Sequence, residues 1–146
     1  MVINKIRKAL TVTAGAYSAN DVVGGRQQLV GIHQGKIQGV VVSDLAAQNV
    51  QYNLVFFSSI PTDIADNATF DIADADMSNI LGVVPLASAA TTRFAFTDNS
   101  LNQSYNIGLP VKSDEADGDI WFIMYTTGTP TYAAVTDVSV LITIEQ

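Results

Sequence analysis

The sequence contains no cysteine, few charged residues and no long apolar run, and each absence excludes a class of protein. Without cysteine there can be no disulfide framework, no zinc–thiolate site and no thiol nucleophile. No apolar stretch approaches the roughly 18 residues of a transmembrane helix. The first residues, MVINKIRKAL, are basic but lack the apolar region of a signal peptide. We therefore expect neither a membrane protein nor a secreted disulfide scaffold.

Charged residues make up only 14% of the chain, against about a quarter in typical soluble domains. Much of the surface must then be Asn, Gln, Ser, Thr and Ala, which is common in proteins that pack into assemblies and fits a stable secreted β-protein equally well. The net charge is −7. Binding to nucleic acid or to anionic lipid needs clustered Lys and Arg, so we expect neither partner.

The length of 146 residues is typical of one domain that can bury a core. Eight or nine short apolar stretches alternate with turn signals along the chain, which favours an all-β, mainly antiparallel fold. We predict a single β-sandwich domain, jelly-roll-like, with one short helix. Residues 1–10 are predicted to be an N-terminal arm or edge strand, and residues 11–146 the sandwich.

The predicted strands follow from period-two alternation and from β-branched runs. They are Asp21–Val23, Gln27–Ile32, Lys36–Asp44, Gln51–Phe57, Val83–Leu86, Arg93–Phe96, Ile120–Thr126 and Thr136–Glu145, with Val2–Val12 as a first strand or an extended arm and Tyr105–Pro110 as an extended segment. The run Val40–Val42 is typical of a strand at the centre of a sheet or buried on both faces. Gly24 and Gly25 are expected to end the second strand, and His33–Gly35 to form a tight turn.

The helix is predicted within Asp71–Ile80, capped by Asp71 or Asp74 and ended by Gly82. An acidic group surrounds it: Asp63, Asp66, Asp71, Asp74 and Asp76. Clustered carboxylates suggest calcium, but the spacing does not match a calcium loop. Helix capping and a solvated face are the favoured interpretation, because acids near a helix start stabilise its dipole. A second acidic run, Asp114, Glu115, Asp117 and Asp119, is likewise interpreted as a solvated turn in preference to a metal site.

Catalytic chemistry has little support in the sequence. His33 is the only histidine, it lies where a turn is expected, and no G-x-S-x-G nucleophile motif is present. Gly24–Gly25 is not a dinucleotide fingerprint. Trp121, Phe122 and Ile123 belong to the most apolar strand, so both faces of that strand should be largely buried, either in the core or at a subunit interface. If Trp121 is in the core, Trp121→Ala should cost about 3–5 kcal/mol. We expect no enzyme activity, no cofactor and no metal.

The amino end carries an unusual charge for this chain. Lys5, Arg7 and Lys8 are three of only seven basic residues, and the remaining sequence is acidic. Such asymmetry suggests contact with an acidic neighbour, either another protein or a further copy of this chain. An ordinary first strand with solvated side chains explains it as well. If the arm is a contact, deleting Met1–Lys8 should weaken binding more than it lowers the melting temperature.

Several ordered motifs resemble small virion proteins of tailed bacteriophages and prophages. They are VTAGAYSANDVVGG, GKIQGVVVSD, YNLVFF, DNATFDIADADMSNILGVV, GLP and TTGTPTYAAVTDVSVLI, spanning about Leu10 to Ile144. The resemblance implies a capsid decoration or cement protein, trimeric, bound to the major capsid protein on the outer head surface. It implies synthesis in the bacterial cytoplasm, where thiols stay reduced, so the absence of cysteine is compatible with it. It brings no catalytic residues.

Two alternatives stay open at this point. The first is another virion part, a head-fibre or tail component. The second, from a different class, is a carbohydrate-binding module that uses the acidic loop with Trp121. A neighbouring major capsid gene would favour decoration, whereas a glycosidase domain on the same transcript would favour carbohydrate binding.

Overall fold

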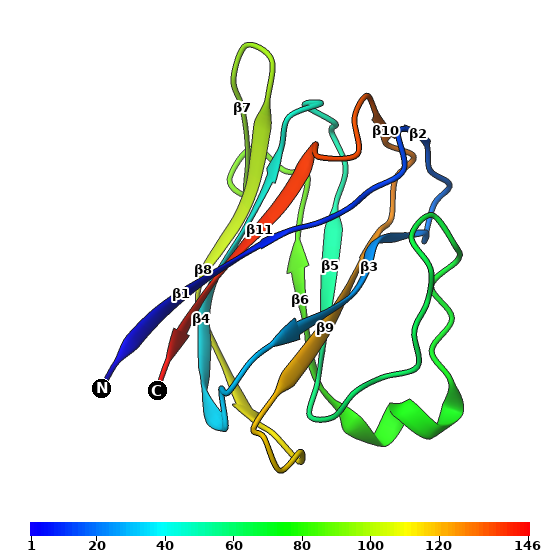
Figure 1. Cartoon of the computed structure of the whole chain (residues 1–146). Helices are drawn as coiled ribbons and strands as arrows, with labels where there is room; N and C mark the ends of the chain where they lie inside the picture. Colours follow the sequence, from blue (N-terminus) through cyan, green and yellow to red (C-terminus); the bar gives the residue numbers. More distant parts are fainter.

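The computed structural model describes all residues, Met1–Gln146, and consists almost entirely of antiparallel strands in a two-layer sandwich (Figure 1). One sheet has five strands in the order β1 (Ile3–Ala9), β11 (Val138–Glu145), β4 (Gln34–Asp44), β8 (Ser100–Lys112) and β7 (Arg93–Ala95). The other has four, in the order β3 (Val22–Leu29), β9 (Ile120–Thr126), β5 (Tyr52–Phe57) and β6 (Ile80–Leu86). A two-stranded ribbon joins β10 (Thr131–Tyr132) to β2 (Gly15–Ala16).

The eight long strands follow the connectivity of a jelly roll. In chain order these strands are β1, β3, β4, β5, β6, β8, β9 and β11, counted here as first to eighth. In the first sheet the first strand pairs with the eighth, the eighth with the third and the third with the sixth. In the second sheet the order is second, seventh, fourth and fifth. This interleaving of sequential strands between two sheets is the double Greek key that defines a jelly roll. The predicted all-β sandwich is therefore confirmed.

The main core lies between the two sheets. Along β11, Val138, Val140, Ile142 and Ile144 are buried and the residues between them are half-buried, as period-two alternation predicts. β4 is the central strand of the five-stranded sheet, which confirms the position predicted from Val40–Val42. Its residues Val40 and Val42 enter the core, whereas Val41 is half-buried on the outer face.

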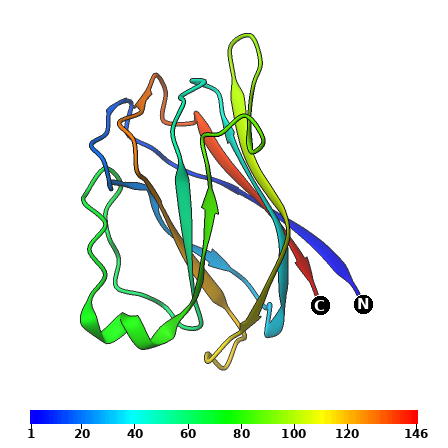
Figure 2. The ribbon, with the colours of Figure 1, turned by 180° about the vertical axis from the view of Figure 1, so that it is seen from behind.

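A second, smaller apolar layer covers the outer face of the four-stranded sheet. The connection between β5 and β6, residues 58–79, crosses this face and is called the cover segment here (Figure 2). Its residues Ile64, Phe70 and Ile72 pack on the small cluster of Val22, Val55, Phe57 and Ile123. The Phe70 ring stacks on Tyr125 with centroids 4.4 Å apart. Because both faces of the sheet are covered, every residue of β5 is buried.

The same arrangement explains the apolar strand β9. Phe122 and Ile123 are buried on opposite faces of the sheet, as predicted. Trp121 is only half-buried, because it lies at the margin of the cover segment. Trp121 therefore packs on the small cluster but is less buried than predicted, and the cost given for a core site does not apply to it.

The single helix is shorter and differently capped than predicted. It is a 3₁₀ helix, Asp74–Asn79, which lies inside the predicted range. Ala73 is its N-cap and no side chain caps it, so neither Asp71 nor Asp74 caps the helix. Gly82 does not end it either, because Ile80 already begins β6 and Gly82 lies within that strand. The capping predictions were therefore wrong, although Asp74 and Asp76 do place acidic side chains in the first turn.

Gly24 and Gly25 do not end a strand. β3 runs through them as one strand with a bulge, seen as a register shift between Val22 and Arg26 against β9. Both glycines have positive φ, +87° and +69°. A Cβ on Gly24 would lie 2.7 Å from Cβ of Leu10, so glycine is needed for the chain to pass. The glycines thus mark a bulge that bends the strand.

Other boundaries shift by a few residues. The turn before β4 lies at Val30–Gly31, so Gln34 and Gly35 belong to β4 instead of a turn. β8 begins at Ser100 and ends at Lys112, well beyond the predicted Tyr105–Pro110. The β7–β8 hairpin projects past the end of the sandwich, at the top of Figure 1. No helix in the chain has the length and apolar character that crossing a bilayer requires.

Candidate interaction surfaces

The three basic residues near the amino end lie on a paired edge strand, not on a free arm. All seven residues of β1 pair with β11. Lys5 and Arg7 are exposed and share a face, and the Arg7 guanidinium donates to Oγ of Ser139 at 3.4 Å. Lys8 has the opposite parity and is half-buried beside Val140. Charged side chains on an edge strand hinder edge-to-edge pairing, which gives these residues a structural role by itself.

Lys5 and Arg7 border a face of the five-stranded sheet that is unusually apolar. An exposed antiparallel sheet normally presents polar residues to water. Here Arg7 is followed across the strands by Leu141, then Val41 and then Gln103. In the adjacent row, Ser43 pairs with Leu101, and Leu101 pairs with Phe94 of β7. The residues called the outer-sheet face below are Lys5, Arg7, Val41, Phe94, Leu101, Tyr105 and Leu141.

Tyr105 completes this face over the central strand. Its ring lies across Gly39, where a Cβ would come within 2.7 Å of Cδ1 of the tyrosine. Tyr105 is nevertheless 55% exposed, and Phe94 is 42% exposed. Phe96, further along the same hairpin, is 58% exposed. The face therefore combines half-buried apolar residues, interspersed with uncharged polar ones, with exposed aromatic rings, and aromatic residues are enriched in the core of protein–protein interfaces.

No carboxylate lies in the central rows of the outer-sheet face, although the chain has 14 acidic residues. Glu145 is the nearest along β11, one row beyond Thr143, and it accepts a hydrogen bond from Gln38 Nε2 at 2.7 Å. Sequence reasoning missed this face. The sequence did contain an indication of it: in strands that alternate between core and solvent, some solvent-facing positions hold apolar residues, and Leu141 is the clearest case.

Asp66 of the first acidic group is a structural anchor. Its carboxylate accepts hydrogen bonds from the backbone N–H groups of Thr13 and Gly24, each at 2.7 Å, and from the Tyr17 hydroxyl at 2.8 Å. These bonds hold the cover segment to the turn before β3. Burial raises the pKa of Tyr17 above its ordinary value, and donation to Asp66 raises it further.

The other acids of that group do not converge on one point. Asp76 is buried and accepts from the Thr62 backbone N–H at 2.9 Å. Asp63, Asp71 and Asp74 are exposed along the cover segment. The prediction of a solvated face holds for these three, but Asp66 and Asp76 instead fasten the segment to itself and to its neighbours.

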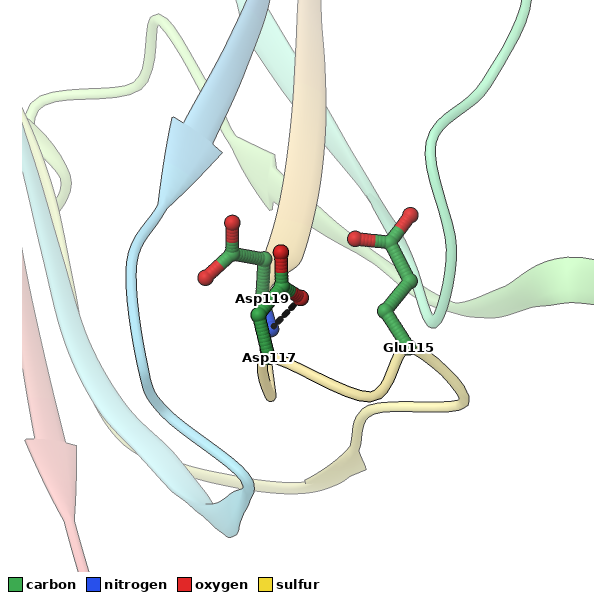
Figure 3. A group of neighbouring side chains, drawn as sticks. All are labelled: Glu115, Asp117 and Asp119. Carbon is green, nitrogen blue, oxygen red and sulfur yellow. Dashed lines mark hydrogen bonds between the residues drawn. The ribbon is translucent and has the colours of Figure 1, made fainter.

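The second acidic run does bring three side chains together (Figure 3). One carboxylate oxygen each from Glu115, Asp117 and Asp119 lie within 4.8 Å of one another. Asp119 is buried and accepts from the Gly31 backbone N–H at 2.8 Å and from the Gln28 side chain. Its interpretation as solvated was therefore wrong, although Asp117 and the separate Asp114 are exposed.

Protein donors already occupy much of this group. Glu115 accepts from the Ile60 backbone N–H and, at 3.1 Å, from Trp121 Nε1. Asp117 accepts from the Asp119 backbone N–H at 3.3 Å. The three residues could each offer an oxygen to a cation, but calcium needs six to eight ligands. What the arrangement does chemically is join the β8–β9 loop to β3, β9 and the cover segment.

His33 and Trp121 are not arranged as the alternatives require. His33 is exposed with φ +55°, its backbone N–H donates to the Gly118 carbonyl, and its ring lies against Gly118. The guanidinium of Arg26 lies 5.6 Å from the centroid of the Trp121 ring. A sugar stacking on that ring would have to compete with Arg26, which makes Trp121 a poor stacking surface for a carbohydrate.

A buried polar network occupies the end of the sandwich near β10. Asp44 is fully buried and accepts from the backbone N–H groups of Ala46 and Gln48, each at 2.8 Å. The Tyr52 hydroxyl lies 3.4 Å from Asp44 and 2.7 Å from the Tyr132 hydroxyl. Burial raises the pKa of all three side chains, Asp44, Tyr52 and Tyr132. The tyrosines therefore stay neutral donors in a structural network.

The sequence matches no protein-family model and no curated protein.

Proposed function

We propose that this chain is a structural protein of a tailed-phage virion, a decoration or cement protein that binds the outer surface of the head and stabilises it. Its partners are the major capsid protein and further copies of itself in a homotrimer. It acts without a cofactor and is not an enzyme. It is made in the cytoplasm of the host bacterium and resides on the capsid surface.

The observation that carries the proposal is the outer-sheet face. Half-buried Val41, Leu101 and Leu141 lie at its centre with no carboxylate among them, and the exposed rings of Phe94 and Tyr105 lie beside them. Exposed apolar side chains gathered on one face mark interaction sites in soluble proteins. The sequence resemblance supplies the identity of the partner, and a jelly roll is compatible with many functions, so the fold alone does not decide it.

Binding to capsids tests the proposal. Heads of the phage or prophage that encodes this chain would be prepared without it and titrated with the purified protein. We expect saturable co-sedimentation with the heads and a higher temperature of head disruption, measured by DNA release. Leu141→Gln is expected to weaken binding, because it places an amide in the apolar centre of the face. Thr129→Gln, in the exposed β9–β10 loop, is the matched control.

The location on the virion separates this proposal from the head-fibre or tail alternative. Antibody labelling of complete virions should decorate the whole head surface. Label confined to the tail or to one vertex would assign the chain to another virion part. Absence of the protein from virions, with no binding to heads, would overturn the proposed function altogether.

A further inference from the structure

Two oppositely charged surfaces lie on opposite sides of this molecule. The outer-sheet face, bordered by Lys5 and Arg7, belongs to the five-stranded sheet. The cover segment lies across the outer face of the other sheet and exposes Asp63, Asp71 and Asp74. Figures 1 and 2 show the cover segment and β1 on different sides of the sandwich. The basic residues near the amino end and the exposed acidic residues of the cover segment therefore lie on opposite sides of the folded molecule.

Both surfaces also expose apolar side chains. On the cover segment, Ile60 is 48% exposed and Met77 is 56% exposed. On the outer-sheet face, Tyr105 and Phe94 are similarly accessible. Each surface therefore offers the two components of a specific contact, apolar area to bury and charge that sets orientation.

Charge determines which pairing is favourable. Two outer-sheet faces packed on each other would give Lys5 and Arg7 little opposite charge, because the central rows contain no carboxylate and Glu145 of the next row is already hydrogen-bonded to Gln38. Two cover segments packed together would bring Asp63, Asp71 and Asp74 near like charges. An outer-sheet face on a cover segment pairs basic with acidic residues and apolar with apolar residues. Such a head-to-tail contact is heterologous, and its repetition closes a ring or grows a chain.

We propose that the outer-sheet face of one copy docks on the cover segment of the next copy, with Lys5 and Arg7 opposite Asp71 and Asp74. This inference rests on the self-association part of the proposed function and deepens it by naming the interface. It does not depend on binding to heads. The outer-sheet face is then buried between sister subunits, and Leu141→Gln weakens binding to heads by dispersing the assembly that binds them. The projecting β7–β8 hairpin with Phe96 lies at the margin of this face.

The test measures the mass of the purified full-length protein by sedimentation, without any heads, at low and high salt. We expect masses above the 15.5 kDa of one chain, with association weaker at high salt. Lys5→Glu/Arg7→Glu and Asp71→Lys/Asp74→Lys should each be monomeric. A mixture of the two variants should associate again, because each supplies the surface that complements the other. A ring of three would be seen as a plateau at three times the chain mass.

Thr127→Glu/Thr129→Glu is the control, since it adds negative charge at two exposed sites in the β9–β10 loop, outside both surfaces. It should associate as the wild type does. Circular dichroism shows whether each variant is folded. If Lys5→Glu/Arg7→Glu does not fold, Lys5→Gln/Arg7→Gln is used in its place. Three results would overturn the inference: a monomeric wild type at all concentrations, a mixture no larger than its components, or a control as impaired as the test variants. Failure of the proposed function is a separate result, because it appears only as loss of binding to heads.

Discussion

Phe122 and Trp121 are neighbours on β9, but their side chains lie on opposite faces of the four-stranded sheet. Phe122 is fully buried in the main core, 5.7 Å from the Phe56 ring centroid. Phe122→Ala should therefore cost about 3–5 kcal/mol of unfolding free energy. Trp121 is half-buried at the margin of the cover segment, so Trp121→Ala should cost clearly less. Denaturant unfolding of both variants checks this order, and equal costs would show that the cover segment is as well packed as the core.

Asp44 predicts how stability depends on pH. Burial is the main cause of its raised pKa, and two backbone donors offset it in part. A carboxyl whose pKa is higher in the folded state binds its proton more tightly there, so its contribution to stability is greatest below the unfolded value, 3.8. That contribution is lost as the pH rises through the folded pKa.

Asp44→Asn removes this titration, and an amide oxygen can replace only one of the two carboxylate acceptors. We expect the wild type to be more stable than the variant, by a margin that grows as the pH falls from about 8 to about 4. The measurement is urea unfolding of both proteins across that range. A margin that shrinks on acidification would mean that Asp44 is charged more readily in the folded state.

The cover segment is the element whose attachment depends most on one side chain. Asp66→Ala leaves the backbone N–H groups of Thr13 and Gly24 without their acceptor. We expect a loss of about 1–3 kcal/mol and faster hydrogen exchange in the cover segment, while β11 stays protected. Asp63→Ala, in the same segment but exposed, should change stability by less than about 0.5 kcal/mol. Unchanged exchange in Asp66→Ala would assign the attachment to apolar packing alone.

Edge strand β1 requires a different variant from the one that the sequence suggests. Deleting Met1–Lys8 removes most of the pairing that covers β11, so it should lower the melting temperature as well as binding. Lys5→Gln/Arg7→Gln/Lys8→Gln keeps the strand and removes its charge. We expect this variant to melt within a few degrees of the wild type and to bind heads less tightly, with a weaker dependence on salt. If the variant binds heads as the wild type does at two salt concentrations, the three residues do not contact the head, and their role is to hinder edge-to-edge strand pairing.

Single elements were predictable where one local pattern dominates. The bounds of β9 follow from its apolar run, and the alternating residues of β11 give its buried face directly. β3 was divided in two because Gly24 and Gly25 are as typical of a turn as of a bulge, and only the approach of Leu10 separates the two cases. Helix capping failed because Asp71 and Asp74 are exposed and neither caps the helix. The carboxylates that do satisfy backbone groups are those of Asp66 and Asp76.

At the scale of the whole molecule, the pairing of strands could not be predicted from the sequence. Periodicity identifies strands and their two faces but not their neighbours, and the jelly roll joins strands as distant as β1 and β11. The outer-sheet face could not be predicted for that reason. Val41, Leu101 and Leu141 come from three strands, and they form a surface only once the order of the sheet is known.

The pairing of the first strand with the last also determines when this surface can exist. Val2 and Gln146 exchange two backbone hydrogen bonds of 2.8 Å beside the β1–β11 ladder. During synthesis β1 leaves the ribosome first and has no partner until β11 follows it. The face that contains Arg7 and Leu141 is therefore incomplete until β11 has been synthesised, so two partly synthesised chains cannot pack on each other through it.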